Sequence, residues 1–359
     1  MIPVEYYAIF YHIIVGCIIF LITSPLMIYS RHEQYNQRVG IFYTYLLLMT
    51  IITFIGLRDP YSVFFVDTVT YTNNFLQMQK YGESVFSKDP GFFLYMWLSS
   101  KILTVNMFYL LSAFLYVFLP YLAFKKWFGY YSLFALLMYI SSMSFWNYGV
   151  NGVRNGLAIS FLIYAFSKHN RKLLMLMLML LAISFHKSLI LPIMAFYIAA
   201  KATNTKKLIF LWLSIALIMA IVGEGLGEGI NNLMKIINFD ERSYELISGK
   251  YDHLEKTGYR LDFILYSSVA ILLGYYYLTK GVGDKFYTRL LNAYIISNTV
   301  WIFFIYADYS NRIAYLSWFL MPIIILYPLL TQSFLKKQNK FIAYSILINF
   351  MVSAFLFFR

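Results

Sequence analysis

The sequence predicts an all-α protein that crosses a membrane about twelve times and carries two long loops on one face. Hydrophobic residues make up 61% of the chain, and charged residues only 13%. Apolar runs long enough to span a bilayer core recur from one end to the other. The basic residues fall in short clusters between these runs, which is typical of a polytopic membrane protein.

The charge and the cysteine content limit which ligands and partners the chain is expected to bind. The net charge is +13, from 29 Lys and Arg against 16 Asp and Glu. In a soluble protein this would suggest nucleic acid. Here the short basic clusters indicate membrane orientation instead, so no nucleic-acid partner is expected. Cys17 is the only cysteine, which excludes an internal disulfide and a multi-cysteine metal site.

The first apolar run lacks a basic n-region and a cleavage site, so it is interpreted as a retained span. The runs predict spans at residues 6–29, 40–57, 106–124, 129–147, 153–167, 173–186, 188–200, 208–223, 262–279, 290–306, 313–331 and 341–358. Three runs are short for a full crossing and could be tilted, extended or partly re-entrant: 153–167, 173–186 and 188–200.

The distribution of Lys and Arg predicts the orientation. One set of loops is rich in Lys and Arg, and Glu33 and Asp284 are its only acids. Short basic loops are cytoplasmic. Both termini and both long loops, 58–104 and 224–260, are then expected outside. The basic set comprises Arg31, Arg38, Lys125, Lys126, Lys168, Arg171, Lys172, Lys201, Lys206, Lys207, Lys280, Lys285, Arg289, Lys336, Lys337 and Lys340. We expect one integral membrane domain over residues 1–359.

The first long loop predicts two short helices. Asp67 or Thr68 could cap the first helix, which would end at Gly82. Asp89-Pro90 has the pattern of an N-cap followed by proline at the first helical position. The segment 91–103 is too short to cross, so it is expected to dip into the outer leaflet or to lie on it.

The second long loop predicts an amphipathic helix, in which the apolar residues recur at helical spacing. These residues are Ile230, Leu233, Met234 and Ile237. The helix could be a lid over an outward site or a plain interfacial helix.

Five basic side chains lie beside apolar runs on the outer face, where they oppose the usual charge bias. Cations in such positions indicate an anionic ligand, such as a lipid diphosphate. The five are Arg58, Arg154, Lys187, Arg260 and Arg312.

Arg154 is the strongest candidate among them, because Asn151 and three glycines surround it. The glycines permit close backbone approach, the asparagine supplies neutral hydrogen bonds, and a guanidinium can grip a phosphate with two parallel bonds. The alternative is an arginine that reaches to the interface without binding a ligand.

Two groups could exchange a proton with a sugar hydroxyl. Asp67 is a carboxylate in the first outer loop, and the alternative is a plain helix cap. His186 lies at an outer turn between two short spans, and the alternative is a hydrogen-bonded structural histidine. Arg58 precedes Asp59, and that pair could also be structural.

Motifs of soluble enzymes are missing. The sequence has no P-loop, no HExxH and no GxSxG. Paired metal carboxylates at short spacing are also missing from the first outer loop, so neither a metal nor another cofactor is expected.

Several short motifs occur in the order found in one known family. They are Gly56-Leu57-Arg58, Val66-Asp67-Thr68 with Tyr71, Asp89-Pro90-Gly91-Phe92, Val153-Arg154-Asn155-Gly156, His186-Lys187-Ser188 and Asn311-Arg312-Ile313. Over about residues 40–330 the chain resembles the EpsG family, a branch of the Wzy-type polysaccharide polymerases. One departure is that the glycine usual before the aspartate is replaced, with Phe64-Phe65-Val66 leading into Asp67.

The resemblance implies a glycosyltransferase of the bacterial cytoplasmic membrane with a GT-C-like architecture. Such proteins join oligosaccharide repeat units carried on undecaprenyl diphosphate at the outer face. Membrane lipid and a chain-length regulator protein are the other implied partners. The site would use Asp67 or His186 as the base, and its binding residues would be Arg58, Tyr71, Asn151, Arg154, Lys187, Arg260 and Arg312.

Two other functions stay open. An O-antigen ligase, or another glycosyltransferase that uses lipid-linked sugars, shares the donor chemistry and would also need outer arginines. A transporter or flippase of lipid-linked oligosaccharide would more naturally show repeated halves and charges at mid-membrane.

Overall fold

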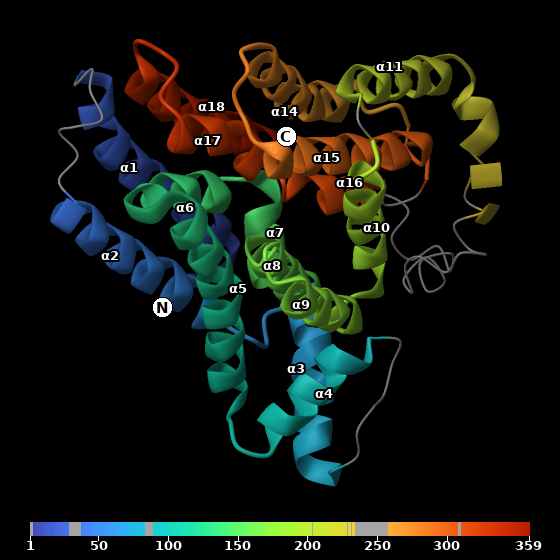
Figure 1. Cartoon of the computed structure of the whole chain (residues 1–359). Coiled ribbons are helices and arrows are strands. Elements are labelled where there is room, and N and C mark those ends of the chain that lie inside the picture. Colours follow the sequence, from blue (N-terminus) through green and yellow to red (C-terminus); the bar gives the residue numbers. More distant parts are fainter. Residues whose placement is uncertain are drawn as a thin grey trace. The chain divides into compact units, whose positions relative to one another are not determined.

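The computed structural model describes residues 3–28, 37–82, 89–202, 204–227, 229–230, 232–233, 258–307 and 310–359. In these ranges every regular element is a helix, which confirms the all-α prediction (Figure 1). The chain divides into two compact units. The first combines Met1–Leu189 with Leu329–Arg359, and the second is Ile190–Pro328.

Among the described residues, six helical segments are long and apolar enough to cross a membrane. They are Val4–Met27, Val105–Ile140, Thr205–Val222, Leu261–Thr279, Ser310–Thr331 and Gln338–Phe358. Shorter apolar helices lie between them, such as Val153–Ser167 and Lys172–Phe185. The chain is therefore a helical, multi-pass membrane protein, and the count of about twelve crossings stays a prediction.

Each predicted span coincides with helical structure, but the runs 129–147 and 313–331 are each broken into two helices. In the first run α6 (Ser132–Ile140) and α7 (Met143–Val150) meet at two serines. Ser141 and Ser142 donate their hydroxyls to the carbonyls three residues earlier, at 3.0 and 2.6 Å. Such bonds compete with the helical backbone pattern, which explains the break.

In the first unit, α5 (Val105–Phe128) packs against α2 (Gln37–Gly56) and α8 (Val153–Ser167). In turn, α8 packs against α9 (Lys172–Phe185). The side chain of Thr104 accepts a hydrogen bond from the Met107 amide and so caps the start of α5. The remaining long pair of this unit is α1 (Tyr7–Ile28) with α18 (Gln338–Phe358).

The described part of the first long loop contains α3 (Val66–Tyr81) and α4 (Pro90–Ser100), which pack on each other (Figure 1). As predicted, α3 ends at Gly82, which has a φ of +72°. The predicted cap is wrong, because Phe65 occupies the N-cap position and Asp67 lies inside the first turn. The short helix α4 also packs on α9.

In the second unit, α15 (Lys285–Phe303) contacts four other helices. They are α10 (Ile190–Ala199), α11 (Thr205–Val222), α14 (Leu261–Thr279) and α16 (Ser310–Trp318). Asn298 of α15 is buried. Its side-chain oxygen accepts a hydrogen bond of 2.7 Å from the indole N–H of Trp212, and its amide nitrogen donates one of 2.9 Å to the hydroxyl of Ser317. Burying these polar groups is tolerated because they hydrogen-bond one another. The unit ends within α17 (Met321–Thr331).

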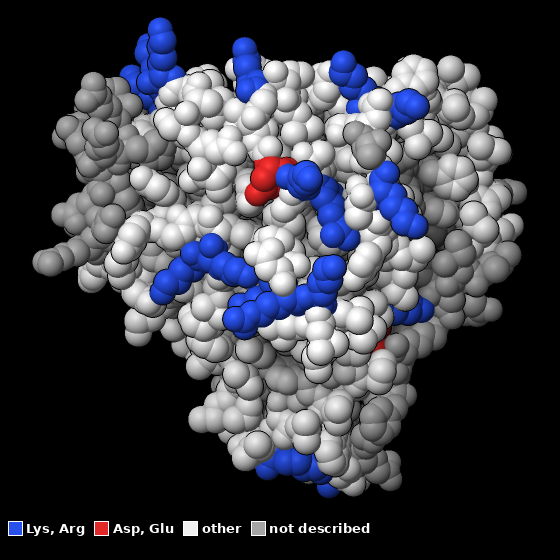
Figure 2. All heavy atoms as spheres, viewed as in Figure 1, with Lys and Arg blue, Asp and Glu red and all other residues white. Residues whose placement is uncertain are grey.

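Large apolar side chains are exposed along the outer faces of several helices. On α9 these include Leu173 and Met177, which are 72% and 59% exposed. On the face shown in Figure 2, Lys and Arg are scattered over a mainly uncharged surface, and Asp and Glu are rare. The exposed apolar side chains fit a lipid environment. Most of the amphipathic helix predicted in the second outer loop lies outside the described residues.

Candidate functional site

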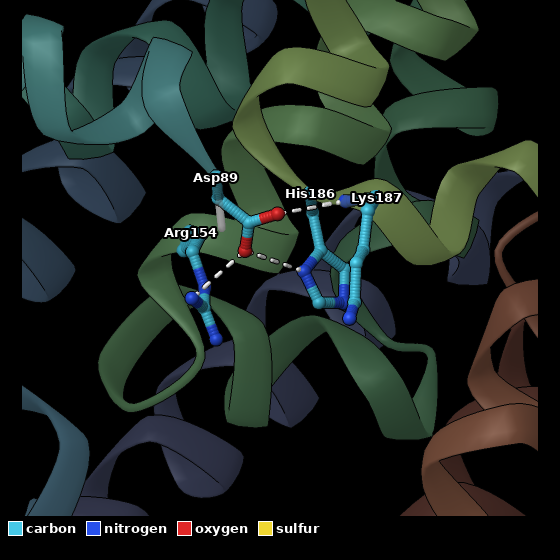
Figure 3. Close-up of polar contacts among 4 residues, drawn as sticks. All are labelled: Asp89, Arg154, His186 and Lys187. Atoms are coloured by element: carbon cyan, nitrogen blue, oxygen red, sulfur yellow. Dashed lines mark hydrogen bonds and ion pairs between the residues drawn. The ribbon is translucent and has the colours of Figure 1, made fainter. Parts of the chain in front are cut away.

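The carboxylate of Asp89 lies at the centre of a polar cluster in the first unit (Figure 3). Its Oδ2 atom lies 2.8 Å from Nη1 of Arg154 and 3.3 Å from Nδ1 of His186. Its Oδ1 atom accepts a hydrogen bond of 2.9 Å from the backbone N–H of Lys187. One carboxylate therefore joins three residues that the sequence predicted to be functional.

Asp89 reaches these partners because of its position in front of α4. It is the N-cap residue of α4, and Pro90 takes the first helical position as predicted. However, its side chain makes no capping bond to α4. Both oxygens are directed instead to the segment that follows α9 and to the start of α8.

A glycine in α4 permits the close approach to α9 that this arrangement needs. A Cβ atom on Gly91 would lie 2.2 Å from Oγ and 2.8 Å from Cβ of Ser184. Since no side chain fits there, only glycine lets α4 and α9 pack at this distance. His186 and Lys187 follow directly after α9, so the contact sets how they meet Asp89.

Asp89 is held as an anion. Only 2% of the residue is exposed. Burial raises the pKa of this carboxyl, but the hydrogen bond with His186 and the charge of Arg154 oppose it, and the net pKa is lowered. The carboxylate is therefore ionised at neutral pH.

The ionised carboxylate decides which nitrogen of His186 carries the proton. Because an ionised carboxylate only accepts hydrogen bonds, the Nδ1 atom of His186 is the donor. In the neutral imidazole, Nε2 is then the nitrogen with the basic lone pair. Figure 3 shows Nε2 on the side of the ring away from Asp89. This is the orientation that a histidine base requires.

Arg154 is the second residue of α8. Its side chain is 13% exposed, the same fraction as that of His186. In Figure 3 the side-chain ends of Arg154, His186 and Lys187 all extend away from Asp89 toward the same side of the view. The three side chains thus present a basic set of nitrogen atoms, which suits a phosphate ligand.

A second group of predicted residues lies at the start of α3. The amide N–H of Asp67 donates to the side-chain oxygen of Asn151 at 2.8 Å. Asp67 is 8% exposed and Arg58 is 3% exposed, so both are buried in this structure. Asn151 precedes Arg154 by three residues, which connects this group to the Asp89 cluster along the chain.

Tyr71 is 5% exposed, and its ring packs edge-on against Phe92 at a centroid distance of 5.1 Å. This contact joins α3 to α4 three residues after Asp89. In this structure Tyr71 therefore supports the two helices, and its predicted role in substrate binding stays a prediction.

The remaining two predicted cations lie in the second unit. Arg260 makes a two-pronged ion pair with Asp262, at 3.0 and 2.8 Å, and its guanidinium lies 3.7 Å from the ring centre of Phe263. Arg312 lies in α16 and is half-buried. The neighbouring residue Asp308 lies outside the described part of the chain.

Comparison with known proteins identifies the family of the chain. A model of the EpsG family matches residues 41–359. The chain belongs to the EpsG family. Membership makes it a membrane protein of polysaccharide biosynthesis. No curated protein and no solved structure matches the chain.

The part of the chain that matches the EpsG family contains every predicted site residue and also Asp89, which the sequence did not place in the site. An Asp before Pro is already explained as the start of a helix, so the sequence gives no reason to assign Asp89 a second role. The available signal was the order of motifs, in which Asp89-Pro90-Gly91-Phe92 stands between those of Asp67 and Arg154. Among the described residues, no group of three His, Cys, Asp or Glu could hold a metal ion.

Proposed function

We propose that this EpsG-family protein is a polysaccharide polymerase with a GT-C-like architecture. It joins oligosaccharide repeat units carried on undecaprenyl diphosphate, at the outer face of the bacterial cytoplasmic membrane. The observation that carries the proposal is the contact of Asp89 with both His186 and Arg154. Through this contact one carboxylate orients a base, His186, and a cation, Arg154, that can stabilise a phosphate leaving group. The proposed transfer needs both groups.

In the proposed reaction, a hydroxyl of the acceptor sugar attacks the anomeric carbon of the donor. A new glycosidic C–O bond forms, and the bond from that carbon to the diphosphate oxygen breaks. The leaving undecaprenyl diphosphate takes the electron pair of the broken bond. The hydroxyl proton passes to Nε2 of His186. No other reactant is required.

Arg154 and Lys187 stabilise the negative charge that grows on the departing diphosphate. Preorganised cations act where charge develops in the transition state, and they act more strongly where water is excluded. The planar guanidinium of Arg154 can donate to a phosphate while it keeps its bond to Asp89. The Asp89 carboxylate holds both Arg154 and His186 in place.

The geometry favours His186 over Asp67 as the base. His186 has a carboxylate partner on Nδ1, so Nε2 is the ring nitrogen that would accept a proton. Asp67 is buried in the first turn of α3, and its amide is bonded to Asn151. The proposal therefore selects His186 from the two bases that the sequence predicts.

The test is deletion of the gene in the bacterium that carries it, followed by analysis of the surface glycan. The proposal expects glycan with a single repeat unit, restored to full length by the wild-type gene. Loss of all surface glycan would point to a flippase and contradict the proposal. Full-length polymer that accumulates on the lipid carrier would point to a ligase and also contradict it.

A further inference from the structure

Arg58 is buried at the end of α2, and its polar contacts are made within the protein. Nη1 donates to the carbonyl of Ile55 at 2.8 Å, and Nη2 donates to Oγ1 of Thr68 at 3.1 Å. The guanidinium lies 4.4 Å from the ring centre of Tyr109. Asp59, the neighbouring acid, accepts instead from the amide of Tyr61. A residue that is 3% exposed and bonded in this way does not present its guanidinium to a ligand.

The hydroxyl of Thr68 links Arg58 to the segment that precedes Arg154. It donates to the carbonyl of Val150 at 2.6 Å while it accepts from Arg58. One residue earlier, the Asp67 amide donates to Asn151 at 2.8 Å. The start of α3 is thus fixed to Arg58 on one side and to residues 150–151 on the other.

Tyr109 of α5 also hydrogen-bonds to the start of α3. Its hydroxyl donates to the carbonyl of Thr68 at 2.8 Å and lies 3.0 Å from Oγ1 of Thr72. Thr72 in turn donates to the carbonyl of Pro60 at 2.9 Å. Arg58, Thr68, Thr72 and Tyr109 therefore form one buried network, which we call the Arg58 network.

Burial of a charge is costly unless hydrogen bonds compensate for it. Burial lowers the pKa of the Arg58 guanidinium to about 10, while Tyr109 and Tyr7 oppose the shift, so the group stays protonated at neutral pH. The cation contacts carbonyl and hydroxyl oxygens and a ring face, none of which carries a charge, and its Nε makes no hydrogen bond among the described residues. A planar donor that spans Ile55 and Thr68 is the feature that arginine supplies and lysine lacks.

We propose that Arg58 is a positioning residue, which sets the place of Arg154 through Thr68 and residues 150–151 and does not contact the substrate. This inference rests on the proposed function, because it concerns how Arg154 is presented to the diphosphate. It replaces the expectation from the sequence that Arg58 itself binds substrate.

Two variants and one control separate the positioning role from direct contact. Arg58→Lys keeps the charge but loses the two-pronged donor. Thr68→Val keeps the shape and removes the hydroxyl that joins Arg58 to Val150. Thr70→Val is the control on the same helix, because Thr70 is exposed and donates only to the carbonyl of Val66 in its own helix.

The first measurement is hydrogen–deuterium exchange of the purified full-length protein. Arg58→Lys and Thr68→Val should both speed exchange at the amides of residues 66–69 and 150–156, and Thr70→Val should not. This readout does not depend on the enzymatic activity. Unchanged exchange in both variants would overturn the positioning role.

The second measurement is the affinity for undecaprenyl diphosphate. Each variant should weaken binding by about tenfold, and the double variant should be no worse than the single ones, because both act through one link. Weak binding in Arg58→Lys with normal binding in Thr68→Val would show direct contact and overturn the proposal. If the wild-type protein binds no undecaprenyl diphosphate, the proposed function fails, while the exchange measurement still decides the structural link.

Discussion

The Nδ1 atom of His186 lies 3.3 Å from Oδ2 of Asp89, although the two residues are 97 positions apart in the sequence. The contact joins the start of α4, in the first long loop, to the end of α9. Through the same oxygen Asp89 also binds Arg154. The site is therefore assembled by one carboxylate, and the predictions below test its parts separately.

Arg154→Lys should weaken binding of undecaprenyl diphosphate by about tenfold or more, because hydrogen bonds to charged groups contribute about 1.5–3 kcal/mol each. Lysine keeps the charge near Asp89 but lacks the planar pair of donors. Titration of the purified variant with undecaprenyl diphosphate measures the effect. Arg171→Lys, at an exposed arginine of the basic loops, is the control. Native affinity in Arg154→Lys would exclude a two-pronged phosphate contact at this residue.

Asp89→Asn should lower the free energy of unfolding at neutral pH by about 3–5 kcal/mol, because it leaves a largely buried Arg154 without its anionic partner. The folded-state pKa of Asp89 is lowered from its ordinary value of 3.8. The ionised carboxylate therefore contributes its full stabilisation of the folded state above about pH 3.8. This stabilisation is lost only as the pH falls through the lower pKa of the folded state. Thermal unfolding of both proteins across pH measures this. A stability difference that already closes between about pH 7 and 5 would mean that the pKa of Asp89 is not lowered.

Gly91→Ala should move α4 away from α9 and separate Asp89 from Lys187 and His186. The added Cβ would meet Ser184, and overpacking of this kind costs about 1–3 kcal/mol. Activity and thermal stability should both fall. Gly225→Ala is the control, since a Cβ there meets nothing within 4 Å. Adding Ser184→Gly to Gly91→Ala should recover part of both losses, and a lack of any recovery would refute this explanation.

The outward orientation predicts which cysteines react in intact cells. Cys17 is first replaced by Ala, because it is exposed. Val63→Cys, in the first outer loop and at a residue 78% exposed, should react with an impermeant thiol reagent from outside. Lys172→Cys, at an exposed residue of the basic loops, should react only after permeabilisation. The reverse pattern would overturn the orientation.

The helices and the candidate cations follow from the sequence, because apolar length and charge bias are local properties. The break at Ser141 does not, since the apolar run continues through it. The break near Leu320 was missed although Pro322, a residue that interrupts helices, follows it directly. The end of α3 at Gly82 was predicted because a positive φ favours glycine. Its start was missed, because Asp67 resembles a cap but forms part of the first turn.

The role of Asp89 could not be found by local rules. An Asp before Pro satisfies the pattern of a helix start, whereas its partners come from two other helices. Arg58 shows the opposite case, in which a cation at a predicted outer helix end is buried among protein groups. Whether a charged side chain faces a ligand or the interior depends on tertiary contacts, which the sequence does not show.

Polymerisation by the purified protein tests the central claim most directly. Wild-type protein in a lipid bilayer disc, given the lipid-linked repeat unit isolated from the deletion strain, should form a ladder of longer glycans and release undecaprenyl diphosphate. His186→Gln and Asp89→Asn should each slow this reaction by about 10² to 10⁴-fold, because the first removes the base and the second its orientation. His169→Gln is the control, at a histidine of the basic loops whose Nδ1 lies 3.2 Å from the Phe166 carbonyl, and it should act at the wild-type rate. Native rates in both site variants would contradict the account.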